Sequence, residues 1–345
     1  MISPKAANFI IRYFDAIDKA VSKRLVRKRP WFETALTSLL CDLLDGETQD
    51  EQNLEYSLEE LNKDLNEIDG LLNISFAIDT HEYNQNVERY ITQSDIGFIL
   101  NFEDYLLPEE SWSAAYLLQA KRLFPDQSEH PITYNENCRF DIDTKQRNRI
   151  EILNKILGVN CIKYLLYCPR PSMLDNITEK KLSYLRNQTI KNRNNFFDNI
   201  FWIFWLKFYQ EAELLENSLS AGIFVNEIEN LPYNLGTVHK SIFKSCLPFS
   251  WFIVQHLFGE IFDEFKDFKY SSSSLYENLL GDTQWEGIKW VHGIVSGNSE
   301  AIDKLIEKLP YIPEEKNFYF LPRHTINIKI TVGNDIDPNF RYIRQ

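Results

Sequence analysis

Residues Ser94 to Phe124 read SDIGFILNFEDYLLPEESWSAAYLLQAKRLF, and this stretch decides the expected fold. Asp95 leads directly into an apolar run, and a second apolar run ends in Gln119-Ala120-Lys121. Both runs have the length and apolar continuity of short buried strands. Paired as a hairpin, they bring Asp95, Gln119 and Lys121 to one end of the same sheet. Since residues two apart on a strand point to the same face, Gln119 and Lys121 face one way.

These residue types suit a hard divalent cation bound close to a phosphate. Asp95 offers a carboxylate, Gln119 an amide oxygen and Ala120 a backbone carbonyl oxygen. Mg²⁺ or Mn²⁺ accepts such oxygen ligands beside water and substrate phosphate. Lys121 would then hold a metal-activated water in line with the scissile phosphorus and stabilise the charge that develops there. The pattern predicts a site for phosphodiester hydrolysis.

The same residues resemble the motif of the PD-(D/E)XK nuclease superfamily, in its restriction-type (Mrr-like) variant with Gln in place of the second acidic residue. The resemblance spans residues 30–169. The first core helix of the family corresponds to residues 32–40, and the first strand to residues 72–78. The crossover helix corresponds to residues 143–157, and the strand after it to residues 161–168. Glu33 is then the helix Glu that commonly reaches the metal site, and Glu88 the acid that precedes the motif strand in many relatives.

The resemblance implies an α/β fold with a restriction-endonuclease-like core, a mixed central sheet flanked by helices. It also implies a metal-dependent endodeoxyribonuclease that degrades foreign DNA in bacterial defence. Its catalytic residues would be Asp95, Gln119, Lys121 and Glu33, with Mg²⁺ or Mn²⁺ held by Asp95, Gln119 and Ala120. Ser94 replaces the Pro of the motif, and Gln119 removes one negative charge, which weakens metal binding.

Three other interpretations use the same residues differently. In a purely structural one, Asp95 is a turn residue, Gln119 a half-buried amide and Lys121 a solvated strand end. In the second, a catalytically degenerate nuclease fold only binds nucleic acid or a partner protein. In the third, the chain is a structural subunit whose aromatic C-terminal half forms an interface. The acidic charge and the Gln favour the second, whereas Asp95, Lys121 and Glu33 favour an enzyme.

The formal net charge of −13 opposes DNA binding, which depends on phosphate neutralisation by Lys and Arg. The charge is uneven, however. Residues 42–69 hold eleven acids and a single Lys, whereas residues 19–29 hold six basic residues and no acid. A second basic cluster lies within 180–193. Each cluster fits either a solvated helix face or a local nucleic-acid contact.

The chain is predicted to contain three parts. Residues 1–30 form an amphipathic helix with a basic end, residues 31–170 the nuclease core, and residues 171–345 a mainly helical, aromatic-rich domain. The Pro169-Arg170-Pro171 sequence marks the second boundary, because prolines end the last core strand. The last part would sense a ligand, hold the nuclease inactive, or bind a partner protein or a second copy of the chain. Helices are expected at 179–186, 195–215, 248–265, 274–280, 284–295 and 299–309, and an alternating strand, adding to a sheet edge, at 325–332.

Composition excludes several other classes. The five Cys form no Cys-x-x-Cys pair and the six His are scattered singly, so no disulfide framework or zinc site is expected. No Walker-type or Gly-x-Gly-x-x-Gly motif is present. The N-terminal helix is interrupted by acids, unlike a secretory signal, and residues 196–209 are too short to span a bilayer. A cytoplasmic protein without membrane contact, with reduced and mostly buried thiols, is expected.

Overall fold

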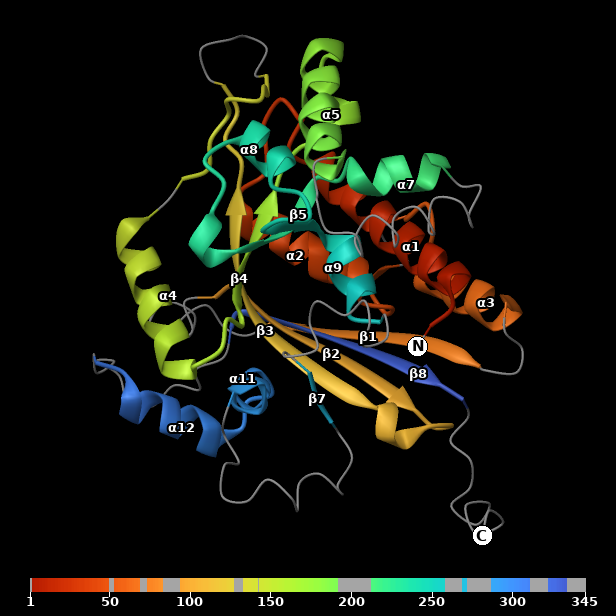
Figure 1. Cartoon of the computed structure of the whole chain (residues 1–345), viewed down its shortest axis with the longest axis vertical. Helices are drawn as coiled ribbons and strands as arrows, with labels where there is room; N and C mark the ends of the chain where they lie inside the picture. The colour runs from red at the N-terminus through yellow and green to blue at the C-terminus, as the bar shows by residue number, and fades with distance from the viewer. Residues whose placement is uncertain are drawn as a thin grey trace.

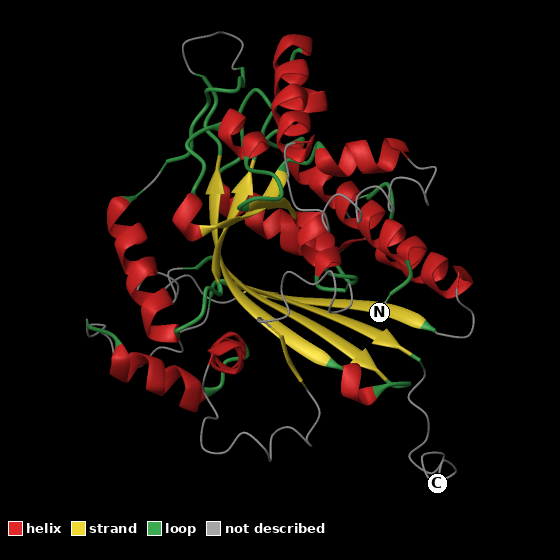
Figure 2. Cartoon of the chain, in the orientation of Figure 1, coloured by secondary structure: helices red, strands yellow, loops and turns green. Residues whose placement is uncertain are grey.

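The chain is an α/β protein with one mixed sheet and helices on both of its faces (Figures 1 and 2). The computed structural model describes residues 2–49, 53–68, 73–82, 94–126, 133–141, 143–191, 212–257, 269–271, 287–310 and 322–333. Within these ranges, no helix combines the length and the apolar composition that crossing a membrane requires. All five Cys are free, and their predicted burial is confirmed.

Seven strands follow one another across the sheet in the order β1-β8-β2-β3-β4-β5-β6, and β7 pairs with β3. The β8–β2 and β3–β4 pairs are parallel, and the other pairs are antiparallel. The strands are β1 (Ile74–Glu82), β2 (Ile96–Asp104), β3 (Trp112–Arg122), β4 (Ile162–Tyr167), β5 (Ile223–Glu227), β6 (Cys246–Pro248), β7 (Lys269–Ser271) and β8 (His324–Val332).

The predicted hairpin is present as β2 and β3, paired antiparallel from Ile96 opposite Leu118 to Phe102 opposite Trp112. Both strands extend further into the connecting segment than the two apolar runs, since β2 continues to Asp104. Most residues of the hairpin are buried, because helices cover it on both faces. This double burial explains why the two runs are continuously apolar and do not alternate.

The helices form two layers (Figure 1). One face of the sheet is covered by α1 (Pro4–Ser22), α2 (Glu33–Leu44), α3 (Leu58–Ile68) and α9 (Phe249–Gln255). The other face carries α4 (Thr144–Leu157), α11 (Gly287–Val295) and α12 (Ser299–Lys308). Three more helices lie beside the β4–β5 end: α5 (Asn176–Lys191), α7 (Ala212–Leu219) and α8 (Leu235–Lys240). Single-turn 3₁₀ segments occur at Pro108–Glu110, Pro171–Met173 and Ile228–Asn230.

Local sequence signals fix the ends of the crossover helix α4. The Asp143 carboxylate accepts hydrogen bonds from the backbone N–H groups of Lys145 and Gln146, at 2.8 and 3.3 Å. Gly158, with φ of +71°, ends the helix in a left-handed conformation that glycine adopts without strain. The predicted helix at 143–157 and the strand that follows it are therefore confirmed.

The alternating segment near the C-terminus forms β8, but its predicted place at a sheet edge is wrong. The strand lies inside the sheet, antiparallel to β1 and parallel to β2. Its residues alternate between buried and half-buried, with Ile326, Ile328 and Ile330 facing the core. Alternation reports that one face of a strand is buried, whereas the choice of neighbours depends on the rest of the sheet.

A separate, mainly helical domain over residues 171–345 is not confirmed. Four described strands of that part, β5 to β8, hydrogen-bond into the same sheet as the N-terminal strands. In addition, α9 and α11 cover opposite faces of the β2–β3 hairpin, so both halves of the sequence build one core. The expected helix at 179–186 lies within α5, and the one expected at 299–309 is present as α12, one residue shorter at its end. Glu88, residues 195–211 and residues 274–280 lie outside the described residues.

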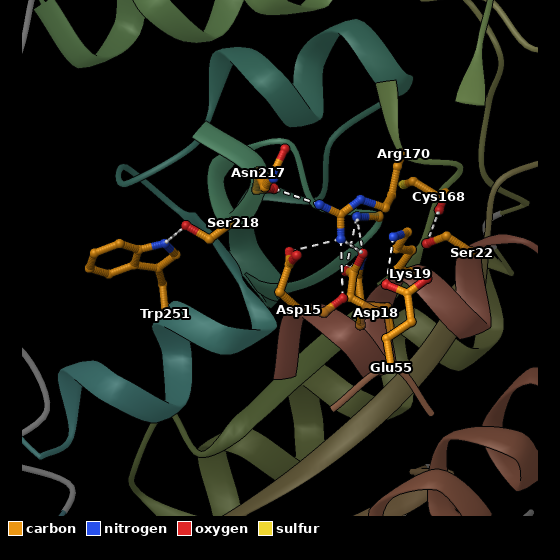
Figure 3. A network of polar contacts seen from close by, with 12 residues as sticks. Asp15, Asp18, Lys19, Ser22, Glu55, Cys168, Arg170, Asn217, Ser218 and Trp251 are labelled. Carbon is orange, nitrogen blue, oxygen red and sulfur yellow. Dashed lines mark hydrogen bonds and ion pairs between the residues drawn. The ribbon is translucent and has the colours of Figure 1, made fainter. Parts of the chain in front are cut away.

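A buried ion-pair network lies at Arg170, where the sequence predicted a domain boundary (Figure 3). The Arg170 guanidinium donates to Asp15 Oδ1 at 2.8 Å, Asp18 Oδ1 at 3.0 Å and the Asn217 carbonyl at 2.7 Å. The Asp18 carboxylate also accepts the backbone N–H groups of Gly222 and Ile223. Thus α1, the end of β4, the end of α7 and the start of β5 are joined through one buried arginine.

Candidate functional site

The end of β3 extends beyond the start of β2, and the candidate site forms there. The last rung between the two strands joins the Asp95 N–H to the Leu118 carbonyl at 3.0 Å. Beyond it, the Ala120 N–H donates to Asp95 Oδ2 at 2.7 Å, and the Arg122 N–H donates to Glu33 Oε2 at 2.9 Å. The carboxylates of Asp95 and Glu33 thus accept the β3 N–H groups that a neighbouring strand would otherwise bind.

Gln119 connects the two oxygen groups predicted to bind a cation. Its Nε2 atom donates to Asp95 Oδ2 in a short hydrogen bond and to the Ala120 carbonyl at 3.2 Å. The two ends of an amide have the same shape, and rotation about the last side-chain bond exchanges them. After that rotation, the Gln119 Oε1, Asp95 Oδ2 and the Ala120 carbonyl would surround one point. The three residues therefore fit the oxygen ligand set of Mg²⁺ or Mn²⁺.

The side chains of Asp95 and Gln119 are buried. Asp95 is 8 % exposed and Gln119 is 2 % exposed. Below them, the Tyr167 hydroxyl bonds to Thr37 Oγ1 at 3.1 Å, and Thr37 Oγ1 donates to the Glu33 carbonyl at 3.1 Å. Burial, together with the nearby negative charges of Asp95 and Glu33, raises the pKa of Tyr167 well above its usual value. Tyr167 is thus uncharged, and its hydrogen bond to Thr37 holds the first turn of α2 in place. No pattern in the sequence indicates this role for either residue.

Lys121 is half-buried and lies on the same strand face as Gln119, toward the start of α4. Two helix N–H groups hold the pKa of the Asp143 carboxyl below its usual value, and the charge of Lys121 adds to this effect. Lys121 makes no hydrogen bond or ion pair with another described residue. Its ammonium group is therefore available beside the candidate metal ligands.

Glu33 is the first residue of α2, and the structure brings it to the strand that carries Gln119 and Lys121. Its Oε2 atom accepts the main-chain N–H of Arg122, so the carboxylate fixes the end of β3 against α2. All four predicted catalytic residues, Asp95, Gln119, Lys121 and Glu33, therefore lie at one end of the hairpin.

Within the described residues, no group of three or more His, Cys, Asp and Glu side chains could hold a metal ion. Asp95 would be the single charged ligand, assisted by an amide and a backbone carbonyl. Affinity for a divalent ion rises with the number of charged ligands, so a site of this composition binds weakly.

Two residues of the second basic cluster, Lys181 and Arg186, are paired within the protein. Lys181 forms an ion pair with Glu136, and the buried Arg186 forms one with Glu216. Burial lowers the pKa of Arg186, and the charge of Glu216 opposes that shift. Arg186 is only 1 % exposed and is therefore a core residue, not a nucleic-acid contact.

The first basic cluster runs from the last turn of α1 into the segment that connects α1 to α2, shortly before Glu33. Near its start, Lys19 and Lys23 pair with Glu55, at 2.6 and 3.7 Å. Further along, Arg27, Lys28 and Arg29 are exposed. A positively charged surface therefore precedes Glu33, on a protein whose net charge is negative.

Comparisons with protein-family models, with curated proteins and with solved structures found no match to this chain.

Gln119→Glu tests whether these oxygens bind a cation. The new carboxylate would lie beside Asp95 Oδ2, and two carboxylates in contact repel unless a cation lies between them. Without metal, we expect the variant to lose about 1–3 kcal/mol of stability. With millimolar Mn²⁺, we expect its melting temperature to rise more than that of the wild type, because binding to the folded state stabilises it.

Gln119→Leu is the matched control for that experiment. It removes the amide without adding a charge, so its melting temperature should not respond to Mn²⁺. Calorimetric titration with Mn²⁺ supplies an independent measure of affinity. Equal Mn²⁺ responses of the Glu and Leu variants would contradict a metal site at Gln119.

Proposed function

We propose that this chain is a metal-dependent deoxyribonuclease with a restriction-endonuclease-like core of the PD-(D/E)XK type. One observation carries the proposal: Asp95, Gln119 and the Ala120 carbonyl converge at the end of β3, with Lys121 on the same strand face. The order α2, α3, β1, β2, β3, α4, β4 supports it, because it contains the core elements of the family in sequence with one added helix, α3. The resemblance implies a cellular role in cytoplasmic defence against foreign DNA.

Mg²⁺ or Mn²⁺, held by Asp95, Gln119 and the Ala120 carbonyl, would lower the pKa of a water and neutralise phosphate charge. The remaining functions belong to side chains of the protein. Lys121 donates hydrogen bonds to the attacking water and to a non-bridging phosphate oxygen, where negative charge develops in the transition state. Glu33 positions the end of β3, and with it Lys121, by holding the Arg122 N–H.

The acidic composition of the chain does not prevent DNA binding at this site. Phosphate contacts depend on local charge over about one Debye length, roughly 8–10 Å at physiological salt. Exposed Arg27, Lys28 and Arg29 supply such charge next to α2. Few phosphate contacts give binding that is weak and sensitive to salt.

The second candidate function is DNA or partner binding by a fold that has lost catalysis. One observation favours it: Asp95 Oδ2 already accepts two N–H groups of the protein, so the hairpin is satisfied without a cation. In that case Asp95 and Gln119 stabilise the end of β3 and do nothing else. Direct assay separates the two functions.

Cleavage of labelled DNA in Mg²⁺ or Mn²⁺, with EDTA as the blank, tests the proposal. We expect cleavage by the wild type and none in EDTA. Asp95→Asn keeps the acceptor for the Ala120 N–H but removes the only charged ligand. It should lower the rate at least about a hundredfold, because a bound metal supplies several kcal/mol of transition-state stabilisation.

Asp79→Asn, an exposed acid on β1, is the control and should cleave at the wild-type rate. DNA binding in Ca²⁺ is measured in parallel. Binding by the wild type without cleavage in any metal would favour the second function. An Asp95→Asn variant as active as the wild type would remove Asp95 from the mechanism.

A further inference from the structure

Phe32 is a large exposed aromatic residue directly beside the candidate site. It lies at the N-cap position of α2, one residue before Glu33, and is 72 % exposed. Helix N-caps favour Ser, Thr, Asp or Asn, whose side chains accept a helix N–H. Phe32 makes no such hydrogen bond. Its ring therefore neither caps the helix nor fills the core.

The ring of Phe32 is nevertheless held in place. The Arg122 guanidinium carbon lies 5.1 Å from the centre of the Phe32 ring and 4.3 Å from that of Phe124. The same guanidinium donates to the Trp31 carbonyl at 2.9 Å. A cation fixed by this hydrogen bond thus contacts Phe32, while most of the ring remains exposed to solvent.

The neighbouring Trp31 differs from Phe32 in its environment. Trp31 is half-buried against the core, and the guanidinium carbons of Arg24 and Arg27 lie 4.9 and 5.8 Å from the centre of its ring. Trp31 therefore has protein partners, whereas Phe32 presents its ring to solvent. Exposed Lys28 and Arg29 add positive charge just before it.

Phe32 is adjacent to the catalytic residues by two routes. Glu33 follows it in the chain, and Arg122, which contacts its ring, follows Lys121. The Arg122 N–H and Glu33 Oε2 are hydrogen-bonded, which closes the connection between α2 and β3. The Phe32 ring therefore lies where α2 and the end of β3 meet, and these two elements carry Glu33, Gln119 and Lys121.

We propose that Phe32 is a stacking platform for an unpaired nucleobase next to the scissile phosphate, so that the substrate is DNA with single-stranded nucleotides, such as a single strand or an overhang. This rests on the proposed nuclease function. A base inside a duplex is already stacked on both sides, whereas an unpaired base can stack on an exposed aromatic ring. An aromatic ring flanked by basic residues is the usual arrangement for binding single strands.

Cleavage rates of a single strand, of a duplex with an overhang and of a blunt duplex test the proposal in Mn²⁺. The wild type should cleave the first two faster. Phe32→Leu keeps an apolar side chain but removes the ring, and should lower those two rates about 10- to 100-fold. Its rate on the blunt duplex should stay within about twofold of the wild type.

Two further variants control for the loss of an exposed apolar side chain. Phe32→Trp keeps an aromatic face and should retain the preference for unpaired DNA. Leu107→Ala truncates an exposed apolar residue, 51 % exposed, beyond the opposite end of β2, and should change no rate. If Phe32→Leu lowered the cleavage rates of all three substrates equally, or lowered none of them, the proposal that Phe32 is a stacking platform would be wrong.

A binding measurement separates failure of the platform from failure of the nuclease proposal. A single strand containing 2-aminopurine loses fluorescence when that base stacks on an aromatic ring. In Ca²⁺, quenching should occur with the wild type and Phe32→Trp and be lost with Phe32→Leu. If the wild type cleaves no DNA, the nuclease proposal fails. The quenching measurement then still tests by itself whether Phe32 stacks on a nucleobase. Quenching that survives in Phe32→Leu would overturn it.

Discussion

Lys121→Ala should lower the single-turnover rate of DNA cleavage by about 10²- to 10³-fold. The lysine lies on the strand face of Gln119 and has no hydrogen-bond or ion-pair partner among the described residues, so its ammonium can donate to the attacking water and to a phosphate oxygen. Those interactions strengthen as charge develops, and their loss therefore affects the transition state more than binding. DNA affinity in Ca²⁺ should fall by less than about tenfold, the cost of one phosphate contact.

Two matched variants define the role of Lys121. Lys145→Ala removes an exposed lysine that, like Lys121, lies close to Asp143, and should leave the rate unchanged. Lys121→Arg should not restore activity, because a planar guanidinium cannot occupy the position of a compact ammonium. If Lys121→Ala lost rate and DNA affinity by the same factor, Lys121 would be an ordinary phosphate contact.

Arg170→Leu should destabilise the protein by about 3–5 kcal/mol at pH 7, because it leaves the buried Asp18 carboxylate without its cation. Arg170 and Asp18 are about 4–5 % exposed, and their side chains join α1 to the strands β4 and β5. The free energy of unfolding is measured by urea denaturation at pH 7 and pH 5, with tryptophan fluorescence as the signal.

The loss should depend on pH in a defined direction. Burial raises the pKa of Asp18 to about 6, and the charge of Arg170 opposes that rise. A carboxyl whose pKa is higher in the folded state than its unfolded value of about 3.9 stabilises the fold most when protonated, and this contribution is lost as the pH rises through the folded pKa. Without Arg170 the pKa of Asp18 rises further, so the variant loses more stability between pH 5 and pH 7 than the wild type does. The deficit of Arg170→Leu is therefore largest at neutral pH and shrinks toward pH 5.

Asp18→Asn, alone and combined with Arg170→Leu, completes a double-mutant cycle. The amide introduced by Asp18→Asn carries no charge, so the cost of Arg170→Leu in that background should be smaller and nearly independent of pH between about 5 and 7. A deficit of equal size at both pH values in the Asp18 background would mean that Arg170 acts mainly through Asp15 or through packing.

Several features of the candidate site could be predicted from the sequence. The apolar runs around Asp95 and Gln119 indicated a hairpin, and antiparallel pairing with a period of two places those residues on one face at one end. The crossover helix expected at 143–157 is capped by Asp143 and Gly158, and such capping depends only on nearby residues. Such features are determined by interactions over short sequence distances.

Other features of the site depend on contacts between distant segments. The Glu33 carboxylate accepts the Arg122 N–H because β3 continues beyond the start of β2 and leaves that group without a strand partner there. Phe32 and Trp31 are adjacent aromatic residues of similar polarity. Which of them is exposed follows from the position of α2 against β3.

The sequence by itself determined the strands of the central hairpin, the crossover helix and the grouping of Asp95, Gln119 and Lys121. Only the tertiary structure decided that β8 lies between β1 and β2, and that Arg170 belongs to a core ion pair at the place where the sequence predicted a domain boundary. The physical reason is that a periodic pattern specifies which face of an element is buried, and not which element covers it. Gly222 illustrates this: a Cβ there would lie 2.0 Å from Ser22 Oγ and 2.4 Å from the Cys168 carbonyl oxygen. That requirement arises only when α1 packs against the strands β4 and β5.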